Sequence, residues 1–353
     1  MSWFSRLTLR GRTVFVGSVL TGGFLLAGAA IPIPYVAIGP GVTYDTLGAV
    51  AGTEVISFVG KGIPASVNEP TPPGGQLNMT TISILERVSL FEGLGMWTTG
   101  RYALAPREDY FPPDKTVEQV QQQDAQAFRD SQSNAEIAAL NYLDYPKVVY
   151  VGTIPNGSPS SDVLEPQDRL TELDRAPVTD FPSLQKALTG SAPGQVVSVT
   201  VLREGKKVTK KVTLGSNPKI GKQGYLGIGA VERPVAPFKI DIVLERIGGP
   251  SAGLMFTLGI IDKLTDGDLT GGRFIAGTGT IDPDGSVGPI GGVLLKLITA
   301  RDAGATVFLV PGDNCAEAVT QIPAGLQLVK VSSVDDAMAA LKTLKAGGTP
   351  PGC

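Results

Sequence analysis

The chain has 353 residues, a formal net charge of −3 and no histidine. A chain of this length is expected to form two or three compact units, and its charge, without any basic stripe, excludes a nucleic-acid binder. The missing histidine excludes Ser-His-Asp triads, Cys-His sites and His-containing zinc motifs, so a nucleophilic serine would have to pass its proton to a lysine or a carboxylate.

The N-terminal segment predicts a membrane anchor. Residues 13–31 carry no charge, and Arg6, Arg10 and Arg12 precede them. About 20 such residues cross a bilayer as a helix, and the positive-inside bias keeps the basic end in the cytoplasm. We therefore predict a cytoplasmic basic segment at 1–12, a single-pass cell-membrane anchor at 13–34 and an extracytoplasmic remainder. Ala27-Gly28-Ala29 leaves open a cleaved signal peptide, but the long apolar run favours a retained anchor.

Residues 35–146 predict a β-rich segment followed by a long helix. The runs "YVAIGPG", "EVISFVG" and "GGQLNMTTISI" are typical of short strands broken by glycine and proline. The stretch "FEGLGMWTTG" predicts a glycine-rich lip with an exposed Trp97; Phe91 and Trp97 could touch lipid or substrate, or be buried. A polar helix is expected from Thr116 to Leu143. We expect this segment to pack with the C-terminal domain.

Residues 147–216 predict a strand, a turn, a second strand, a helix closed by Gly190 and a hairpin about "REGKK". This order resembles a PDZ domain of the bacterial protease-associated kind. The residues that carry the resemblance are Gly157-Ser158-Pro159-Ser160, Leu164, Gln167-Asp168 and Arg203-Glu204-Gly205. It implies capture of an extended peptide at a sheet edge, between the strand near Val148–Val151 and the helix near Pro182–Leu188. The alternative is a small β-rich domain that only packs.

Residues 217–346 predict an α/β domain, because strand and helix patterns alternate there; the chain as a whole is α+β. Two glycine-edged segments stand out, "GGPSAG" at 248–253 and "GTGTIDPDGSVGPIGGVLLK" at 277–296. Ser251 at a helix start would expose its hydroxyl beside unpaired N–H groups. Lys296 has apolar neighbours, and lost solvation would lower its pKa and leave a neutral amine. We predict that Lys296 is the base for Ser251.

These motifs resemble the proteolytic domain of the Lon family. The serine motif is Gly249-Pro250-Ser251-Ala252-Gly253, and the lysine motif is Thr278-Gly279 followed by Pro289-Ile290-Gly291-Gly292 and Lys296. The resemblance implies that Ser251 is the nucleophile, Lys296 the base and Thr278 a hydroxyl that positions the amine. Backbone N–H groups around Ser251 and Ala252, with Gly249 as a further candidate, would meet the oxyanion. Thr280 departs from the family, which usually has glutamate there.

The order of anchor, PDZ-like domain and Lon-like domain resembles bacterial membrane-anchored Lon-like peptidases. It implies an ATP-independent serine endopeptidase with no cofactor or metal, acting on unfolded or C-terminal protein segments, with a homo-oligomeric ring as a family property. The nearest match to a Walker A loop, 215–223, has the wrong glycine spacing and ends in Gln223. The alternative function is a PDZ scaffold at the membrane whose serine–lysine pair is idle or only self-processing.

Two smaller features complete the prediction. Ser183 and Lys186 fit the S-x-x-K signature of penicillin-binding proteins, but without its partner motifs we interpret the match as chance. Cys315 and Cys353 are too few for a disulfide framework or a tetrahedral metal site. We interpret both cysteines as incidental and leave open whether they pair. The segment 347–353 is expected to be a flexible tail.

Overall fold

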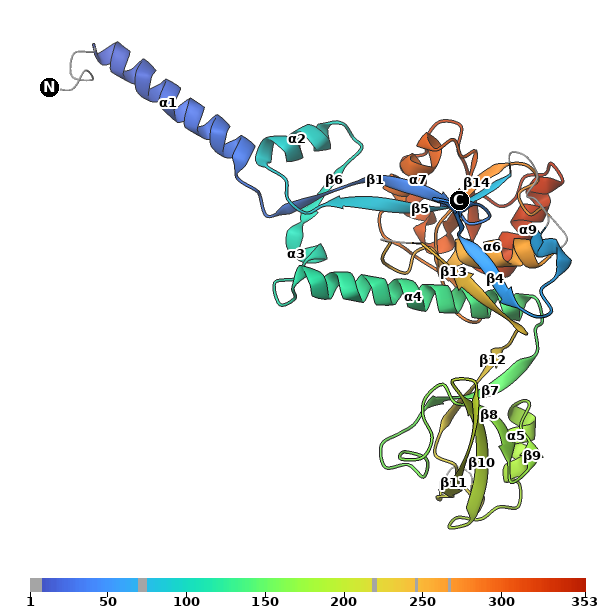
Figure 1. Ribbon diagram of the computed structural model, residues 1–353. Helices are drawn as coiled ribbons and strands as arrows, with labels where there is room; N and C mark the ends of the chain where they lie inside the picture. The colour runs from blue at the N-terminus through green and yellow to red at the C-terminus, as the bar shows by residue number, and fades with distance from the viewer. Residues whose placement is uncertain (1–7, 69–74, 218–220, 245–246, 266–267) are drawn as a thin grey trace.

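The computed structural model describes residues 8–68, 75–217, 221–244, 247–265 and 268–353. Three parts follow one another in space: an isolated helix, an α/β body and a smaller β-rich unit (Figure 1). The candidate site residues all lie in the described ranges, whereas Arg6 of the predicted basic segment and residues 218–220 of the Walker-like stretch lie outside them.

Helix α1 (Leu9–Ala30) projects from the body and is almost entirely exposed. Among the described residues it is the one helix long and apolar enough to cross a membrane. A membrane span and a signal sequence share these properties, so the helix is a candidate anchor. It begins at Leu9 with Thr8 as N-cap and ends at Ala30, before the end predicted for the anchor.

The body is built on a mixed sheet in the order β18-β17-β14-β5-β1-β6. Strands β14 (Phe274–Gly277), β17 (Val307–Pro311) and β18 (Gln327–Val331) run parallel to one another and to β5 (Gln76–Leu85). Strands β1 (Tyr35–Asp45) and β6 (Ala103–Pro106) are antiparallel to their neighbours. This confirms the α/β prediction for the C-terminal domain.

Helices cover both faces of this sheet, as alternate residues of its strands show. Val307 and Leu309 of β17 point into the core formed with α4 (Val117–Tyr142), α6 (Gly253–Leu264) and α9 (Val334–Lys345). Phe308 and Val310 point to the opposite core, formed with α7 (Val293–Asp302) and α8 (Cys315–Ala318). Burial on both faces explains why "VFLVP" is apolar throughout and not alternating.

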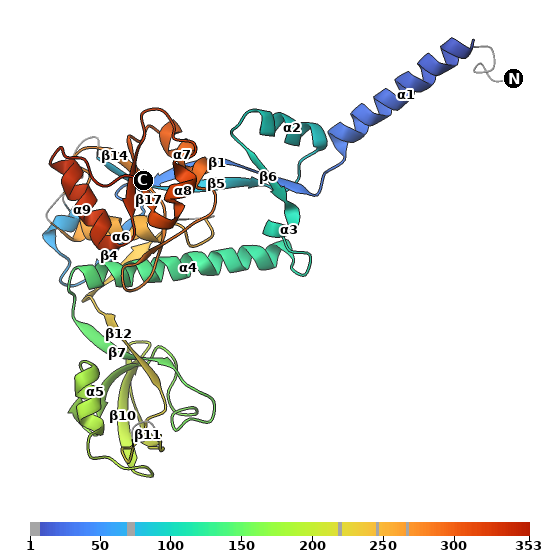
Figure 2. The same ribbon diagram turned by 180° about the vertical axis from the view of Figure 1, so that it is seen from behind.

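The segment 35–146 contributes to the same core as the C-terminal domain. Strand β5 pairs with β14, and β4 (Ile56–Gly60) pairs antiparallel with β13 (Phe238–Ile242). Helix α4 lies against α6, and the rings of Phe128 and Phe256 meet edge to face at 5.8 Å. The helix that was predicted at 116–143 thus forms one wall of the body (Figure 2).

The predicted lip is a helix and not a loop. Helix α2 (Leu90–Thr98) begins with a capping box in which Ser89 and Glu92 exchange hydrogen bonds. Its glycines suggested a loop, yet Gly93 is buried and gives room for close packing on Ile33 and Leu104. Trp97 is 61% exposed, as predicted.

The second unit is a sheet in the order β11-β10-β8-β7-β12. Its strands are β7 (Lys147–Thr153), β8 (Arg169–Leu173), β9 (Ala176–Pro177, paired with β8), β10 (Val196–Arg203), β11 (Lys206–Thr213) and β12 (Gly229–Pro234). Helix α5 (Phe181–Leu188) packs on it. Strand β12 falls in the range expected for the C-terminal domain but pairs with β7 in this sheet. The unit hangs from the body on β7 and β12 (Figures 1 and 2).

The two cysteines form a disulfide, so their interpretation as incidental is wrong. Cys353 is bonded to Cys315 at the start of α8, across 38 residues of sequence. The N–H of Lys330 in β18 also donates to the carbonyl of Pro351. The tail that was expected to be flexible is therefore fixed to the body beside β18.

We expect Cys353→Ser to lower the stability of the folded protein. Opening a loop of 38 residues removes up to about 4 kcal/mol of chain-entropy stabilisation. Urea unfolding should show an earlier midpoint, and Cys315→Ser should match it as the control. Reductant should shift the wild-type midpoint to that of the variants; equal midpoints for all forms without reductant would contradict the stabilising role.

Candidate active site

The serine loop is held tightly at the start of α6. Ser251 lies in the turn before this helix, Gly249 adopts a left-handed backbone with φ of +84°, and Ala252 is the N-cap. A Cβ atom at Gly253 would lie 2.5 Å from Cγ2 of Ile281, so only glycine fits there. The glycines of the serine motif thus allow the backbone conformation that exposes the Ser251 hydroxyl.

The lysine comes from the first turn of α7. Gly292, with φ of +69°, is the N-cap of this helix, and its carbonyl accepts from the N–H of Lys296 at 3.1 Å. The side chain reaches across to the serine loop, where Nζ lies 2.8 Å from Oγ of Ser251 and 2.9 Å from Oγ1 of Thr278. The structure therefore brings together the three side chains that the sequence singled out.

The Lys296 amine is enclosed in the protein. Its side chain is only 2% exposed, and burial lowers the pKa of Lys296 from 10.5 to about 7. None of the ion pairs within the described ranges involves this lysine. Because burial acts without a compensating carboxylate, a large fraction of the amine is neutral near pH 7 and can accept a proton.

Thr278, directly after β14, links the lysine to the serine loop. Its hydroxyl accepts from Nζ of Lys296 and donates to the carbonyl oxygen of Ser251 at 3.0 Å. The N–H of Gly279 donates to the same carbonyl at 2.9 Å. Thr278 is fully buried, so its rotamer is fixed by packing as well as by hydrogen bonds.

The backbone donors around Ser251 differ in their availability. The N–H groups of Ser251 and Ala252 have no acceptor among the described residues, at the free N-terminal end of α6. The N–H of Gly249, by contrast, donates to the carbonyl of Asp124 in α4 at 2.9 Å. The suggestion of Gly249 as an oxyanion donor is wrong for this conformation, because its hydrogen is already used.

Helix α4 holds both halves of the site, which the sequence did not reveal. Buried Ser131 donates through its hydroxyl to the carbonyl of Pro250 at 2.9 Å, next to Ser251. Asn134 donates to the carbonyl of Ile281, just beyond Thr278, at 3.1 Å. Serine and asparagine in a polar helix usually face water, so no sequence signal separates these two from their neighbours.

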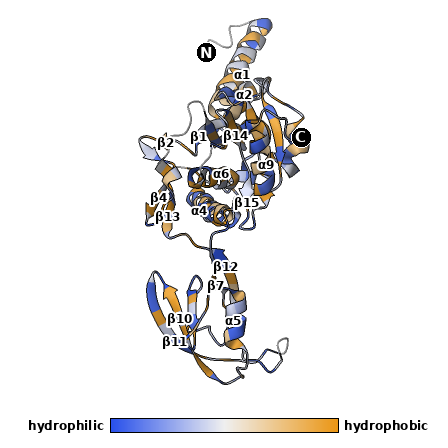
Figure 3. Ribbon diagram, turned by 90° about the vertical axis from the view of Figure 1, so that its right-hand side faces the viewer, coloured by the Kyte–Doolittle hydropathy of each residue, from blue (hydrophilic) through white to orange (hydrophobic). Residues whose placement is uncertain are grey.

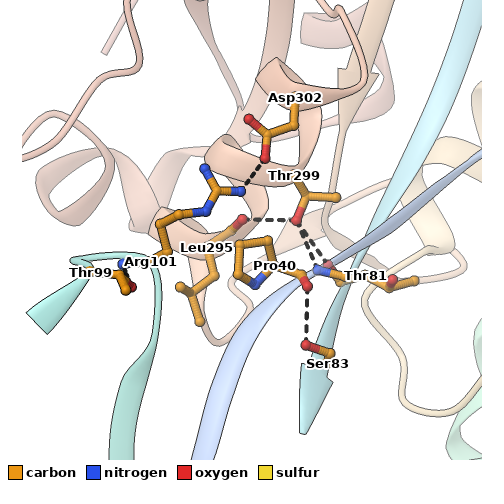
Figure 4. Close-up of polar contacts among 9 residues, drawn as sticks. Pro40, Thr81, Ser83, Thr99, Arg101, Leu295, Thr299 and Asp302 are labelled. Carbon is orange, nitrogen blue, oxygen red and sulfur yellow. Dashed lines mark hydrogen bonds and ion pairs between the residues drawn. The ribbon is translucent and has the colours of Figure 1, made fainter. Parts of the chain in front are cut away.

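Helix α7 is fixed to the strands beneath it (Figure 4). The Thr299 hydroxyl accepts from the N–H of Gly41, at the irregularity in β1, at 3.0 Å, and donates to the carbonyl of Leu295 at 2.9 Å. Further along α7, Asp302 forms an ion pair with Arg101, from the loop between α2 and β6. Both contacts restrict movement of the helix that carries Lys296.

A cavity of about 640 Å³ opens above Ser251 and Lys296. Its walls are the serine loop, Gly291, part of α4, Tyr110 and the facing stretches of β1 and β5. A separate cavity of about 410 Å³ beside α9 and Tyr142 contains neither residue. The first cavity is large enough for several substrate residues, and the aligned strands beside it suit an extended chain.

The predicted position of the peptide groove is wrong. Strand β7, which contains Val148–Val151, is paired with β12 along one edge and meets β8 on the other. Strand β12 is instead the edge of the sheet. At the start of α5 the N–H of Phe181 donates to Glu232, and beyond its end the carbonyl of Ser191 accepts from Gly224. Residues 224–232 thus run along α5, and the open sheet edge lies at β12.

Family models match both units, but the PDZ match begins within α4 and ends before β12. Residues 247–343 match the family model for the Lon protease (S16) C-terminal proteolytic domain, and residues 119–214 match the model for the PDZ domain. The Lon protease of Azospirillum brasilense is 38% identical over 93 residues, which cover 26% of this chain and 11% of the relative. Lon protease 2 of Bacillus subtilis is 26% identical over 144 residues, covering 37% of this chain and 26% of that protein.

Solved structures of PDZ domains are similar to about a quarter of the chain. The PDZ domain of an SdrC-like protein from Listeria monocytogenes is 25% identical over 24% of this chain and 87% of its own, with a TM-score of 0.22. The corresponding domain from Listeria innocua is 19% identical over 24% of this chain and 92% of its own, also with a TM-score of 0.22.

The chain spans a small part of the Lon relatives' length, 11% and 26% of these two proteins. The family models place the PDZ domain and the proteolytic domain in separate stretches of the chain. Behind an apolar N-terminal helix, the chain therefore carries a PDZ domain and a Lon-type proteolytic domain.

Proposed function

We propose that the protein is a membrane-anchored serine endopeptidase that works with a Ser251–Lys296 dyad and without ATP. The observation that carries the proposal is the 2.8 Å contact between Oγ of Ser251 and a buried amine. Burial that lowers the pKa of Lys296 to about 7 gives that amine the proton affinity a general base needs at neutral pH. The Lon-type domain supports serine peptidase chemistry.

In the proposed first step, the neutral Nζ of Lys296 takes the proton of the Ser251 hydroxyl while Oγ bonds to the carbonyl carbon of the substrate. The N–H groups of Ser251 and Ala252 would stabilise the negative oxygen. The C–N bond then breaks, and the Lys296 ammonium returns its proton to the leaving amine. In the second step Lys296 takes a proton from a water molecule, whose oxygen attacks the ester carbon; the bond from that carbon to Oγ then breaks, and the Lys296 ammonium returns the proton to Oγ, which releases the acid and free Ser251.

The remaining parts of the chain suggest how substrates reach the dyad. The edge of β12 beside α5 would accept an extended or C-terminal peptide segment, while α1 would keep the enzyme at the outer face of the membrane. Without an ATP-driven unfolding step, flexible segments and small membrane-associated proteins would be the substrates. Assembly into a ring is proposed only from the resemblance to Lon proteases.

We expect Ser251→Ala and Lys296→Met to lower kcat/KM for an unstructured protein by at least about 10³-fold, because each removes one half of a unit that acts together. A fluorophosphonate probe should label Ser251 in the wild type and neither variant. Ser183→Ala, in the S-x-x-K match on the PDZ helix, is the matched control and should keep activity. Retained cleavage in Ser251→Ala, or no labelling of the wild type, would favour the alternative of a PDZ scaffold.

The activity should depend on pH through Lys296. Since the pKa of Lys296 is lowered to about 7, the protonated and inactive form dominates below this pH. We expect kcat/KM for a short peptide to fall about tenfold per pH unit below the pKa and to level off above it. A profile that stays flat from pH 5.5 to 8.5 would contradict Lys296 as the base.

Peptide capture should depend on the groove between β12 and α5. Leu188 is a partly buried apolar residue of α5, whereas Gln185 on the same helix is exposed. We expect Leu188→Glu to weaken binding of a fluorescent peptide with an apolar C-terminus by at least about tenfold, the cost of lost apolar contact and a desolvated charge. Gln185→Glu is the control. Both variants should cleave a short peptide at the wild-type rate. Equal peptide binding by the two variants would show that the binding groove does not lie beside α5.

A further inference from the structure

Helix α2 presents an apolar face that the protein does not cover. Phe91, Leu94 and Trp97 are 37%, 46% and 61% exposed. At 100° per residue these side chains share one side of the helix. The buried side lies around Gly93, which packs on Ile33 and Leu104. A helix with one packed face and a second apolar face open to the outside needs a partner of apolar chemistry.

The open face is continuous with the surface of α1. The rings of Phe91 and Phe24 meet edge to face with centroids 6.1 Å apart. Phe91 also lies over Gly28, where a Cβ atom would come within 2.6 Å of the ring. Gly28 is the one buried residue of α1 in the described part of the chain. Phe24 itself is 62% exposed, so its ring and that of Phe91 belong to one apolar surface.

The contact sets the depth of α2 relative to α1. Gly28 and Phe24 precede the end of α1 at Ala30, and at 1.5 Å per residue they lie about 3 and 9 Å before that end. If α1 crosses a bilayer, as proposed above, its last turns lie at the outer boundary of the hydrocarbon layer. Phe91 then lies at the depth of lipid and not above it.

The polar groups of α2 agree with this placement. Glu92 points to the side opposite Leu94 by helical periodicity, and its carboxylate accepts from the backbone N–H of Ser89. Trp97 on α2 and Tyr35 at the start of β1, which is 41% exposed, are residue types enriched where a membrane meets water. Figure 3 shows α1 and α2 together at one end of the molecule, away from the PDZ domain.

We propose that α2 lies in the outer interface of the membrane, with Phe91, Leu94 and Trp97 in contact with lipid. The proposal rests on α1 as a membrane anchor. Helix α1 alone would leave the body free to swing, and α2 provides a second attachment. Strands β1 and β5, together with the Arg101–Asp302 ion pair, connect this end of the molecule to α7. The height of Ser251 above the membrane is thereby fixed.

Tryptophan fluorescence in vesicles tests the proposal. The chain has two tryptophans, Trp3 and Trp97, so Trp3→Phe leaves Trp97 alone in the full chain. In phosphatidylcholine vesicles we expect brominated phospholipids to quench most of the Trp97 emission. As the control, Trp3→Phe/Trp97→Phe/Tyr142→Trp places the probe at the end of α4 near the PDZ domain, where it should remain unquenched.

Several outcomes would overturn the proposal. Unquenched Trp97 in protein that resists alkaline extraction would mean that α1 is inserted while α2 is not. Protein lost on alkaline extraction would remove the anchor on which the proposal rests. Equal quenching of both probes would show unspecific adsorption. The emission of Trp97 could also stay unquenched by lipid but change when the protein is diluted in the vesicles. This result would show that the apolar face of α2 contacts a second copy of the protein and not lipid.

A functional measurement separates this surface from the dyad. We expect Leu94→Glu/Trp97→Glu to lower cleavage of a membrane-tethered substrate while cleavage of the same sequence in solution stays unchanged. Thr99→Glu, at the exposed C-cap of the same helix and on the side away from Leu94, is the charge control. Equal loss on both substrates would refute a role in placement. The quenching result does not depend on catalysis, so it stands if Ser251 proves inactive.

Discussion

The burial of the Lys296 amine is the constraint on which both the chemistry of the site and the pH dependence of stability depend. With the pKa of Lys296 lowered from 10.5 to about 7, the folded state binds fewer protons than the unfolded state between these values. Stability therefore rises with pH across this window, and the cost, on the order of 4–5 kcal/mol, is fully present below pH 7. Two features offset this cost. The hydroxyls of Thr278 and Ser251 accept hydrogen bonds from Nζ, and the large apolar core stabilises the folded state. Groups that are costly for stability concentrate at functional sites.

The site is assembled from both halves of the chain. The serine loop and α7 come from the Lon-type domain, whereas α4, β1 and β5 come from the segment before the β-rich unit. Ser131 fixes Pro250, and Gly41 binds Thr299 one turn beyond Lys296. These N-terminal elements also line the cavity above the dyad. The early segment therefore belongs to the proteolytic body, and its strands complete the sheet that the Lon-type domain begins.

Local chemistry decided what could be predicted from the sequence. The serine and lysine motifs were recognisable because the local backbone requires glycine at fixed positions. A side chain at Gly253 would clash with Ile281, and Gly292 has a left-handed backbone. Contacts between segments that are far apart in the sequence could not be predicted in this way. The resemblance to a PDZ domain led us to predict the peptide groove beside β7, but β12 takes the sheet edge next to α5. The hydrogen bond of Gly249 to Asp124 and the bond between Cys315 and Cys353 also join segments that carry no mutual signal.

The short link between the two units has an evolutionary consequence. The PDZ domain leaves the body after α4 and returns before β13, and the N–H of Val235 donates to the carbonyl of Pro146 where the two connections meet. The whole PDZ domain is thus inserted between two positions of the proteolytic body that lie next to each other in space. Such a module can be exchanged or removed without a break in the chain path around Ser251 and Lys296, so its peptide specificity is structurally independent of their chemistry.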